Sequence, residues 1–214
     1  MAHLSEQPLQ RTLFGATTSA FDSDFKSLVR TELDEESWID FAPGWLSGSD
    51  QLFEQILTTR NWRQRKRWMY EKEVLEPRLT DYWNLGLGQK LEPALLEEIR
   101  LSLSARYEVD FDSLGFNFYR NGDDAVAWHG DKIRKEIAEP IVALISLGSR
   151  RRFLLRPKEG GKSRVYLLGH GDLFVTGGKT QRNWQHSVPR VASAGPRISM
   201  AFRHGMDARA YGAR

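Results

Sequence analysis

The sequence has no cysteine among its 214 residues. Disulfide bonds, thiolate metal sites, iron–sulfur clusters and a cysteine nucleophile are therefore excluded, and any metal must be held by histidine, aspartate or glutamate. No apolar run approaches the roughly 18–20 residues that a membrane span needs. The first residues also lack the basic and apolar regions of a secretory signal. We therefore expect a cytoplasmic monomer with no membrane contact.

The net charge of +3 conceals an uneven distribution along the chain. Residues 150–214 carry 14 Lys and Arg against 3 Asp and Glu, a net of +11, whereas residues 1–149 carry 17 against 25, a net of −8. A basic half favours an anionic partner, most commonly nucleic acid. The alternative is that these basic residues only solvate the surface of a sheet.

The order of local signals predicts one domain with three segments. The 7 Trp, 6 Tyr and 11 Phe are too many for a disordered chain, and the length suits a single core. Glycine and proline punctuate residues 1–45, which predicts an irregular N-terminal arm with short local elements. Within residues 46–110 we expect a helix over 50–59, capped by Ser49, and a second over 94–107, beginning after Pro93.

Short alternating segments take over in residues 111–214, the predicted core. We predict strands at 115–120, 140–147, 152–156, 164–168, 172–176 and 196–203. Turn signals such as Asn121-Gly122 and Gly177-Gly178 separate them. Because strands and helices do not alternate, this pattern indicates a β-sandwich, jelly roll or barrel. With two helices packed on one sheet, the fold class is α+β.

His129 and Asp131 form a His-x-Asp pattern at the end of an expected strand. Their side chains point to the same side, because the side-chain period of a strand is two, and Gly130 between them leaves room for a ligand. A second histidine would complete the two-histidine, one-carboxylate set that binds non-haem Fe(II) and leaves positions open. His186, 57 residues further on, is the best candidate. Taken alone, the pattern also fits a pair on the surface.

Two arginines share one face of the last strand. In Pro196–Arg203, strict alternation puts Arg197 and Arg203 on one face and apolar residues on the other. If the polar face lines an interior, two guanidinium groups predict a small dianion such as a dicarboxylate. Asn117 and Tyr119 share a face of an earlier strand and could hydrogen-bond the same dicarboxylate. The alternative is that both polar faces lie in water.

Several of these segments together resemble the AlkB family of Fe(II)/2-oxoglutarate dioxygenases. They are Asn117-Phe118-Tyr119-Arg120, Asp124-Ala125-Val126-Ala127-Trp128-His129-Gly130-Asp131, Ile145-Ser146-Leu147-Gly148, His170-Gly171-Asp172-Leu173, Gly177-Gly178, Trp184-Gln185-His186 and Arg197 to Arg203. The resemblance runs from about Pro77 to Arg203, with the order and spacing of the family. It is specific because the segments occur together, whereas each alone is a weak signal.

The resemblance implies a double-stranded β-helix of the jelly-roll type. It implies that His129, Asp131 and His186 ligate iron and form the catalytic centre. It further implies that Arg197 and Arg203 bind the two ends of 2-oxoglutarate, with hydrogen bonds from Asn117 and Tyr119. The implied reaction is oxidative demethylation of N-alkylated bases in DNA, with RNA as an open alternative. It consumes 2-oxoglutarate and O₂ and releases succinate, CO₂ and formaldehyde.

The segment Glu76–Trp83 resembles the nucleotide-recognition lid of this family. A base inside a duplex must be flipped out before chemistry, and a flipped base needs flat aromatic partners. We expect Tyr82, Trp83 and Trp128 to supply them, and Arg78 to contact the substrate. The alternative for each tryptophan is a place in the core.

Basic clusters offer candidate contacts to phosphates. The segment Arg60–Trp68 holds five basic residues and two Trp, which fits either a phosphate-binding stripe or a solvated helix end. Arg150–Arg152 and Arg182 are further candidates.

One position departs from the family pattern. Many members that repair nucleic acid have an acidic residue shortly after His-x-Asp, whereas this chain has Ile133, which cannot accept a hydrogen bond. Other readings therefore stay open. They are a 2-oxoglutarate oxygenase acting on a modified tRNA base or a non-nucleic-acid substrate, a non-catalytic nucleic-acid-binding module, and a zinc hydrolase. The last lacks an obvious general base and leaves the two arginines unexplained.

Overall fold

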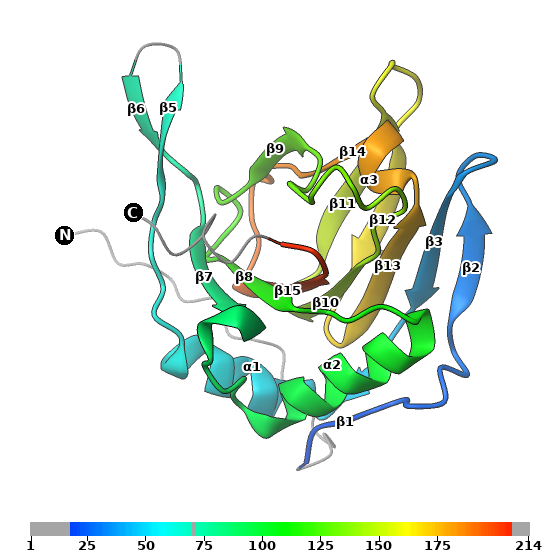
Figure 1. Ribbon diagram of the computed structural model, residues 1–214. Coiled ribbons are helices and arrows are strands. Elements are labelled where there is room, and N and C mark those ends of the chain that lie inside the picture. Colours follow the sequence, from blue (N-terminus) through cyan, green and yellow to red (C-terminus); the bar gives the residue numbers. More distant parts are fainter. Residues whose placement is uncertain (1–17, 70–71, 207–214) are drawn as a thin grey trace.

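Two antiparallel sheets form the body of the molecule (Figure 1). The computed structural model describes residues 18–69 and 72–206, without the side chains of residues 67–69 and 72. The larger sheet has the order β2 (Val29–Glu32), β3 (Ser37–Ala42), β13 (Asp172–Gly178), β10 (Val142–Gly148), β15 (Arg197–Arg203), β8 (Ser113–Tyr119) and β7 (Leu79–Asn84). The smaller sheet has the order β12 (Arg164–Leu168), β11 (Arg151–Pro157), β14 (Trp184–Val188) and β9 (Val126–His129).

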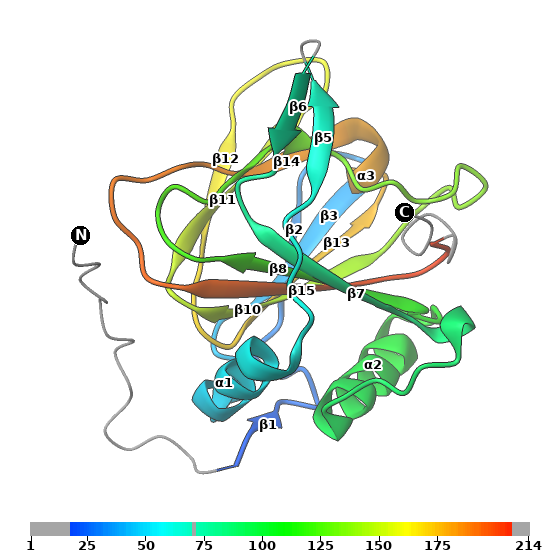
Figure 2. The same cartoon turned by 90° about the vertical axis from the view of Figure 1, so that its left-hand side faces the viewer.

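Helices α1 (Ser49–Thr59) and α2 (Ala94–Tyr107) lie side by side under the larger sheet (Figure 2). The predicted jelly roll with helices on one sheet is thereby confirmed. The expected cap is wrong in one detail, because Gly48 occupies the N-cap position in a left-handed conformation and Ser49 is already helical. The remaining elements are β1 (Ala20–Phe21), β4 (Leu46–Ser47), β5 (Lys66–Met69), β6 (Lys72–Leu75), the 3-10 helix η1 (Leu85–Leu87) and α3 (Thr180–Asn183).

The larger sheet is packed on both faces. Its lower face meets the two helices in a core that includes Phe53, Leu96 and Phe202. Its upper face meets the smaller sheet in a second core that includes Phe153 and Phe174. Burial of this apolar surface is the main favourable term for the fold, and it leaves the alternate residues of β8 and β15 facing the space between the sheets.

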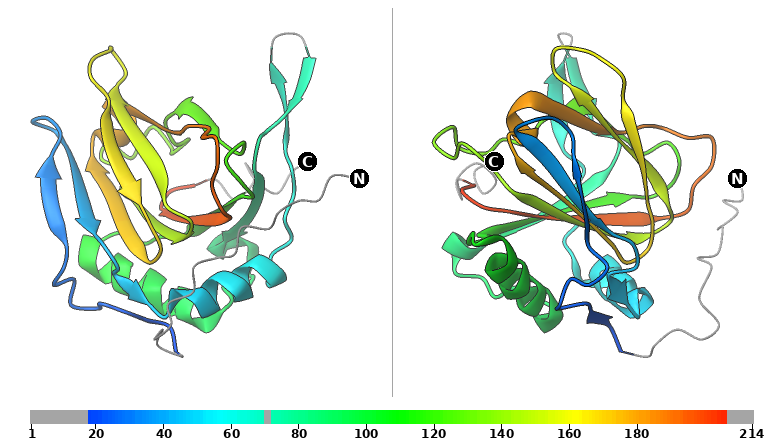
Figure 3. Two further views of the ribbon diagram at one scale, coloured as in Figure 1. Left: turned by 180° about the vertical axis from the view of Figure 1, so that it is seen from behind. Right: turned by 90° about the vertical axis from the view of Figure 1, so that its right-hand side faces the viewer.

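The described part of the predicted arm, residues 18–45, has short elements as expected, but it is not irregular, because two of its strands belong to the larger sheet. Strands β2 and β3 extend the larger sheet beyond β13, as the view from behind shows (Figure 3). Asp40 concealed this strand, because a charge within SWIDFA does not suggest a buried segment. The carboxylate of Asp40 accepts hydrogen bonds from Arg30 at 2.7 and 2.9 Å and from the Tyr107 hydroxyl at 3.0 Å. A buried charge satisfied in this way is compatible with a strand interior.

All six predicted strands are present, displaced by at most two residues at either end, and the second helix has the predicted bounds. No strand was predicted at β7 or β14, and β9 was expected only through its end at His129. Because β2, β3 and β7 share one sheet with β8, β10, β13 and β15, the predicted boundaries at residues 45 and 110 do not separate structural units. In the described part of the chain, no helix is both long and apolar enough to cross a bilayer.

Candidate active site

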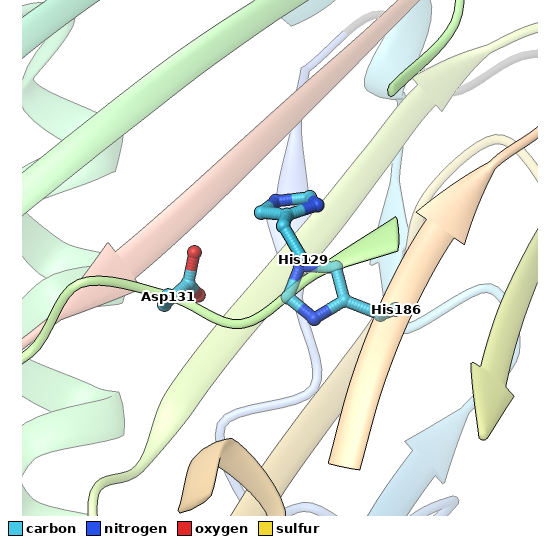
Figure 4. Close-up of side chains that lie close together, drawn as sticks. All are labelled: His129, Asp131 and His186. Atoms are coloured by element: carbon cyan, nitrogen blue, oxygen red, sulfur yellow. The ribbon is translucent and has the colours of Figure 1, made fainter. Parts of the chain in front are cut away.

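His129, Asp131 and His186 come together between the two sheets (Figure 4). One potential ligand atom from each lies within 4.8 Å of the others, and the two imidazole rings have centroids 4.2 Å apart. This is the donor set of a facial two-histidine, one-carboxylate iron site. The structure therefore assembles the triad that the sequence predicts.

Strand pairing explains the convergence. His129 ends β9 and lies directly opposite His186 on β14 in an antiparallel register. Opposed residues of an antiparallel pair place their side chains on the same face. Asp131 follows two residues after His129, where the strand has ended, so its carboxylate turns toward the pair of rings.

The electrostatics of the triad suit a cation. Burial lowers the pKa of His186 to about 3 and also lowers that of His129, so that both rings are neutral near pH 7. Burial alone would raise the pKa of Asp131, but the nearby charge of Arg203 holds it well below its ordinary value. Two neutral imidazoles and one carboxylate are the protonation states that metal binding requires.

Hydrogen bonds fix the orientation of two triad members. Nδ1 of His129 lies 2.8 Å from the carbonyl oxygen of Ala127, which leaves Nε2 for a metal. The backbone N–H of Asp131 donates to Oε1 of Gln181 at 3.1 Å. The carboxylate of Asp131 accepts a hydrogen bond from Nη2 of Arg203 at 3.0 Å. Gln181 is buried on α3, 50 residues from Asp131. The role of Gln181 could not be predicted from the sequence, because a contact between residues this far apart leaves no local pattern.

Two glycines pack closely against other groups of the site. A Cβ at Gly115 would lie 2.8 Å from Nη1 of Arg203, so glycine makes room for that guanidinium. A Cβ at Gly130 would lie 3.3 Å from the carbonyl oxygen of Gln181. The Cβ position at Gly130 thus faces α3, and Gly130 itself is among the residues that line the cavity at the triad.

A cavity of about 350 Å³ opens beside the triad. Its walls include six further residues that the sequence singled out or placed on the same strand faces, namely Arg78, Tyr82, Asn117, Tyr119, Ser199 and Arg203. They come from the turn before β7 and from strands β7, β8 and β15. The volume falls in the range of small-ligand sites, so it has room for a cosubstrate and part of a substrate.

Arg197 lies behind this wall. Its side chain is 1% exposed, and its guanidinium carbon is 5.2 Å from the centre of the Tyr119 ring. Nε donates to the hydroxyl of Ser146 at 3.0 Å, whereas Nη1 and Nη2 have no hydrogen-bond partner among the described residues. A buried guanidinium with two unsatisfied nitrogens is costly unless an anion binds it. The residues therefore fit a dicarboxylate held between Arg197 and the triad.

Of the expected aromatic contacts, only Tyr82 lines the cavity. Trp83 is 2% exposed in the core beneath the sheet, and its Nε1 donates to the carbonyl oxygen of Gln89. Trp128 alternates with His129 on β9 and does not line the cavity; Arg156 stacks on its ring with 4.2 Å between guanidinium carbon and centroid. Neither tryptophan is in a position to stack on a base in the cavity.

Some of the candidate phosphate-binding residues are buried in the fold, and others are exposed. Arg151 is buried and donates to three backbone carbonyls, and Arg182 also donates to backbone carbonyls, so both arginines are committed to the fold. Arg63 and Arg65 are exposed, and Arg65 lies at the cavity. The Trp68 side chain lies outside the described part of the chain.

Ile133 does not face the cavity. It is 5% exposed and packs with Val142, Ala201 and Met206 in a small apolar cluster. The segment after His-x-Asp therefore fills a core at this position, and it presents no acceptor there to a bound base.

A family model describing the 2OG-Fe(II) oxygenase superfamily matches residues 88–203. The chain belongs to this superfamily. Within it, the chain is similar to AlkB homologues. "Alpha-ketoglutarate-dependent dioxygenase alkB homolog 3" of Bos taurus is 31% identical over 189 residues, covering 78% of this chain and 66% of that protein. The Homo sapiens protein of the same name is 33% identical over 174 residues, covering 72% and 61%.

A third relative, "DNA oxidative demethylase ALKBH2" of Arabidopsis thaliana, is 35% identical over 129 residues, covering 47% of this chain and 41% of that protein. The chain thus spans less than two thirds of the length of these curated relatives. Among solved structures, "The structure of OsALKBH1" superposes with a TM-score of 0.57 at 16% identity, covering 82% of this chain and 99% of that one. A 2OG-Fe(II) oxygenase family oxidoreductase from Burkholderia pseudomallei superposes at 0.55 with 12% identity, covering 77% and 84%. Both share the fold.

Proposed function

We propose that this chain is an Fe(II)- and 2-oxoglutarate-dependent dioxygenase that removes N-methyl groups from bases in nucleic acid, with DNA as the first substrate to test. The observation that carries the proposal is the His129–Asp131–His186 triad beside a cavity lined by Tyr82 and Arg78. The names of the alkB homolog 3 and ALKBH2 relatives support it. RNA is the alternative nucleic acid to test.

The protein's own groups have separable tasks in this proposal. His129, Asp131 and His186 hold the metal, and Arg203 orients Asp131 through its hydrogen bond. Arg197 binds the far carboxylate of 2-oxoglutarate with the two nitrogens that lack partners. Asn117 and Tyr119 are alternate residues of β8 that line the cavity, and they would hydrogen-bond the cosubstrate. When bound, iron and 2-oxoglutarate supply the oxidising chemistry, with O₂ as the oxidant.

The overall reaction balances with these components. The methylated base, 2-oxoglutarate and O₂ become the unmethylated base, formaldehyde, succinate and CO₂. The protein must place the methyl carbon beside the metal and exclude water from the cavity. Tyr82 offers a ring for stacking and Arg78 a charged donor, and both come from the segment that precedes and begins β7.

The test is an assay on single-stranded oligonucleotides carrying 1-methyladenine or 3-methylcytosine. Protein loaded anaerobically with Fe(II) receives 2-oxoglutarate and then O₂, and succinate and repaired base are measured in the same sample. We expect equimolar products from the wild type and neither product from His186→Ala. Circular dichroism confirms that the variant is folded.

Two other results would direct the search elsewhere. Succinate without repaired base would support an oxygenase of this superfamily with another substrate, such as a modified tRNA base or a small molecule. The position of Ile133 in a core makes that alternative worth testing. Neither product from protein with bound iron would favour a non-catalytic binding module.

A further inference from the structure

The smaller sheet carries positive charge that the proposed reaction does not use. Its strands, β9, β11, β12 and β14, contain four arginines and no aspartate or glutamate. Two of the arginines are committed to the fold. Arg151 donates to three backbone carbonyls, and Arg164 donates to two backbone carbonyls at the end of β2. The other two, Arg152 and Arg156, lie four residues apart on β11.

The alternation of β11 turns Arg152 and Arg156 away from the triad. Phe153 and Leu155, which alternate with them, are buried in the core between the sheets, and neighbouring residues of a strand point to opposite faces. Arg152 is exposed, and its side chain has no hydrogen-bond or ion-pair partner among the described residues. Arg156 is half-buried and donates to Oε1 of Gln185 at 3.2 Å. Both guanidinium groups therefore lie on the solvent side of the smaller sheet.

Apolar and aromatic side chains lie beside the two arginines on this side of the sheet. On β12, Val165 is 56% exposed and Leu167 is 52% exposed. Val165 is paired with Leu154 of β11, and opposed residues share a face. The guanidinium carbon of Arg156 lies 4.2 Å from the ring centre of Trp128 on β9. We call this set the outer basic face; it consists of Trp128, Arg152, Leu154, Arg156, Val165 and Leu167.

The outer basic face begins next to the cavity. β9 is the edge strand of the smaller sheet, and Trp128 directly precedes a triad histidine on it, so one strand separates this face from the triad. The end of β11 also reaches the cavity, because Cε of Lys158 would lie 4.0 Å from a Cβ at Gly130, a residue of the cavity wall. A polymer that leaves the cavity over β9 meets Trp128 first and Arg152 last, and about 13 Å of β11 separate Arg152 from Arg156.

We propose that the outer basic face binds the single-stranded nucleic acid that flanks the methylated base on one side. The inference rests on the proposed function. Phosphates are polyanionic and complement Arg152 and Arg156, and the guanidinium stacked on Trp128 offers a flat surface for a base. Because a nucleic-acid strand has a direction, only the 5′ or only the 3′ flank runs over β9. Binding should therefore depend on which flank is present, a dependence that an acidic protein segment on this face would not show.

The experiment compares three oligonucleotides that each carry one 3-methylcytosine. The first has a single neighbour on each side. The other two extend it on the 5′ or the 3′ side alone by about ten nucleotides, within the usual site size of about 4–16. Anisotropy gives the dissociation constants of the anaerobic Fe(II)–2-oxoglutarate protein, and O₂ is then admitted to measure repair. We expect one extension to tighten binding more than the other, and Arg152→Gln to weaken binding of that oligonucleotide about fivefold, the upper end for an exposed ion pair.

Arg106→Gln is the matched control. Arg106 is exposed on the last turn of α2, below the larger sheet and away from the smaller one. Its substitution removes the same charge from the protein, so the gain from the favoured extension should persist. Arg152→Lys, which keeps the charge, should retain most of the gain. The melting temperature of each variant shows that it is folded, and the shortest oligonucleotide should bind all of them equally.

The outcomes separate the two proposals. Equal gains from both extensions, or a gain that Arg152→Gln leaves intact, would overturn the inference. A loss of the same size in Arg106→Gln would also overturn it, because net charge would then explain the effect. Repair of no oligonucleotide by the wild type, with iron bound, would overturn the proposed function for this base. A gain in binding that only Arg152→Gln removes would, in that case, still support the outer basic face as a nucleic-acid site.

Discussion

Arg203 donates a hydrogen bond of 3.0 Å to Asp131, although the two residues are 72 positions apart in the chain. The pair joins the last strand of the larger sheet to the loop that follows β9 on the smaller one. It therefore connects the group expected to bind the cosubstrate with a group expected to bind the metal. Because both are poorly exposed, water competes weakly for the bond.

Arg203→Lys should weaken iron binding. Lysine keeps the charge but loses the planar fork that reaches Asp131, and the loss of such outer contacts reduces metal affinity about 10- to 100-fold. Anaerobic titration with Fe(II) measures the effect. Arg152→Lys is the control, because Arg152 is exposed on β11 and should leave the affinity unchanged. Equal affinity in wild type and Arg203→Lys would show that Asp131 needs no such support.

Arg197→Met should separate cosubstrate binding from folding. The variant loses charge-assisted bonds to a carboxylate, so the 2-oxoglutarate requirement should rise about tenfold or more. Without 2-oxoglutarate its melting temperature should be no lower than that of the wild type, because it removes a buried charge with two unpartnered nitrogens. Added 2-oxoglutarate should raise the melting temperature of the wild type alone. A shift of equal size in the variant would place the dianion elsewhere.

Tyr82 and Trp83 should give opposite results on substitution, although they are adjacent. Tyr82→Ala should weaken binding of a methylated oligonucleotide by about 1–3 kcal/mol, the contribution of stacking on a base. It should lower stability by less than Trp83→Ala does, through loss of the hydrogen bond that the buried Asn84 side chain donates to the Tyr82 hydroxyl. Trp83→Ala should lower the free energy of unfolding by about 3–5 kcal/mol, because it empties part of the core. Anisotropy and urea denaturation measure the two effects. If Tyr82→Ala reduced stability and Trp83→Ala reduced DNA binding instead, the orientation of β7 in the structure would be contradicted.

Affinity for single-stranded DNA should fall steeply with salt. Arg63, Arg65 and Lys132 are exposed, and the last two lie at the cavity. Each phosphate neutralised contributes about −0.7 to the slope of log K against log salt for a single strand. Lys132→Ala should reduce the slope by that amount and weaken all sequences alike. A flat dependence would count against a phosphate-binding rim.

The alternation of residues explains what the sequence could predict. In β15 the large apolar residues Ile198, Met200 and Phe202 alternate with polar or small ones, so the positions of Arg197 and Arg203 on one face follow from the period of a strand. The triad was predictable because His129 and Asp131 carry a local pattern. By contrast, β7 was not predicted as a strand, so the two-residue alternation of strand side chains was not used to place Tyr82 and Trp83. Once the strand is known, the same rule puts Tyr82 at the cavity and Trp83 in the core.

Long-range polar contacts set the limit of sequence reasoning. Asp40 is compatible with a buried strand only because Arg30 and Tyr107 reach it, and Tyr107 is 67 residues away. Gln181 supports Asp131 from a helix of four residues. Neither contact produces a local periodicity, so a polar residue in the sequence suggests exposure. These are the places where tertiary structure overrides the pattern.

The alternation of residues in β15 also predicts that mutations at neighbouring positions have different effects. A saturation scan of residues 197–203, read out separately for protein abundance and for repair, should show a period of two. Substitutions at Ile198, Met200 and Phe202 should deplete the protein, because these side chains are buried against the helices. Substitutions at Arg197 and Arg203 should leave the protein abundant and inactive. Selection on a single strand thus acts on stability and on chemistry at alternate residues.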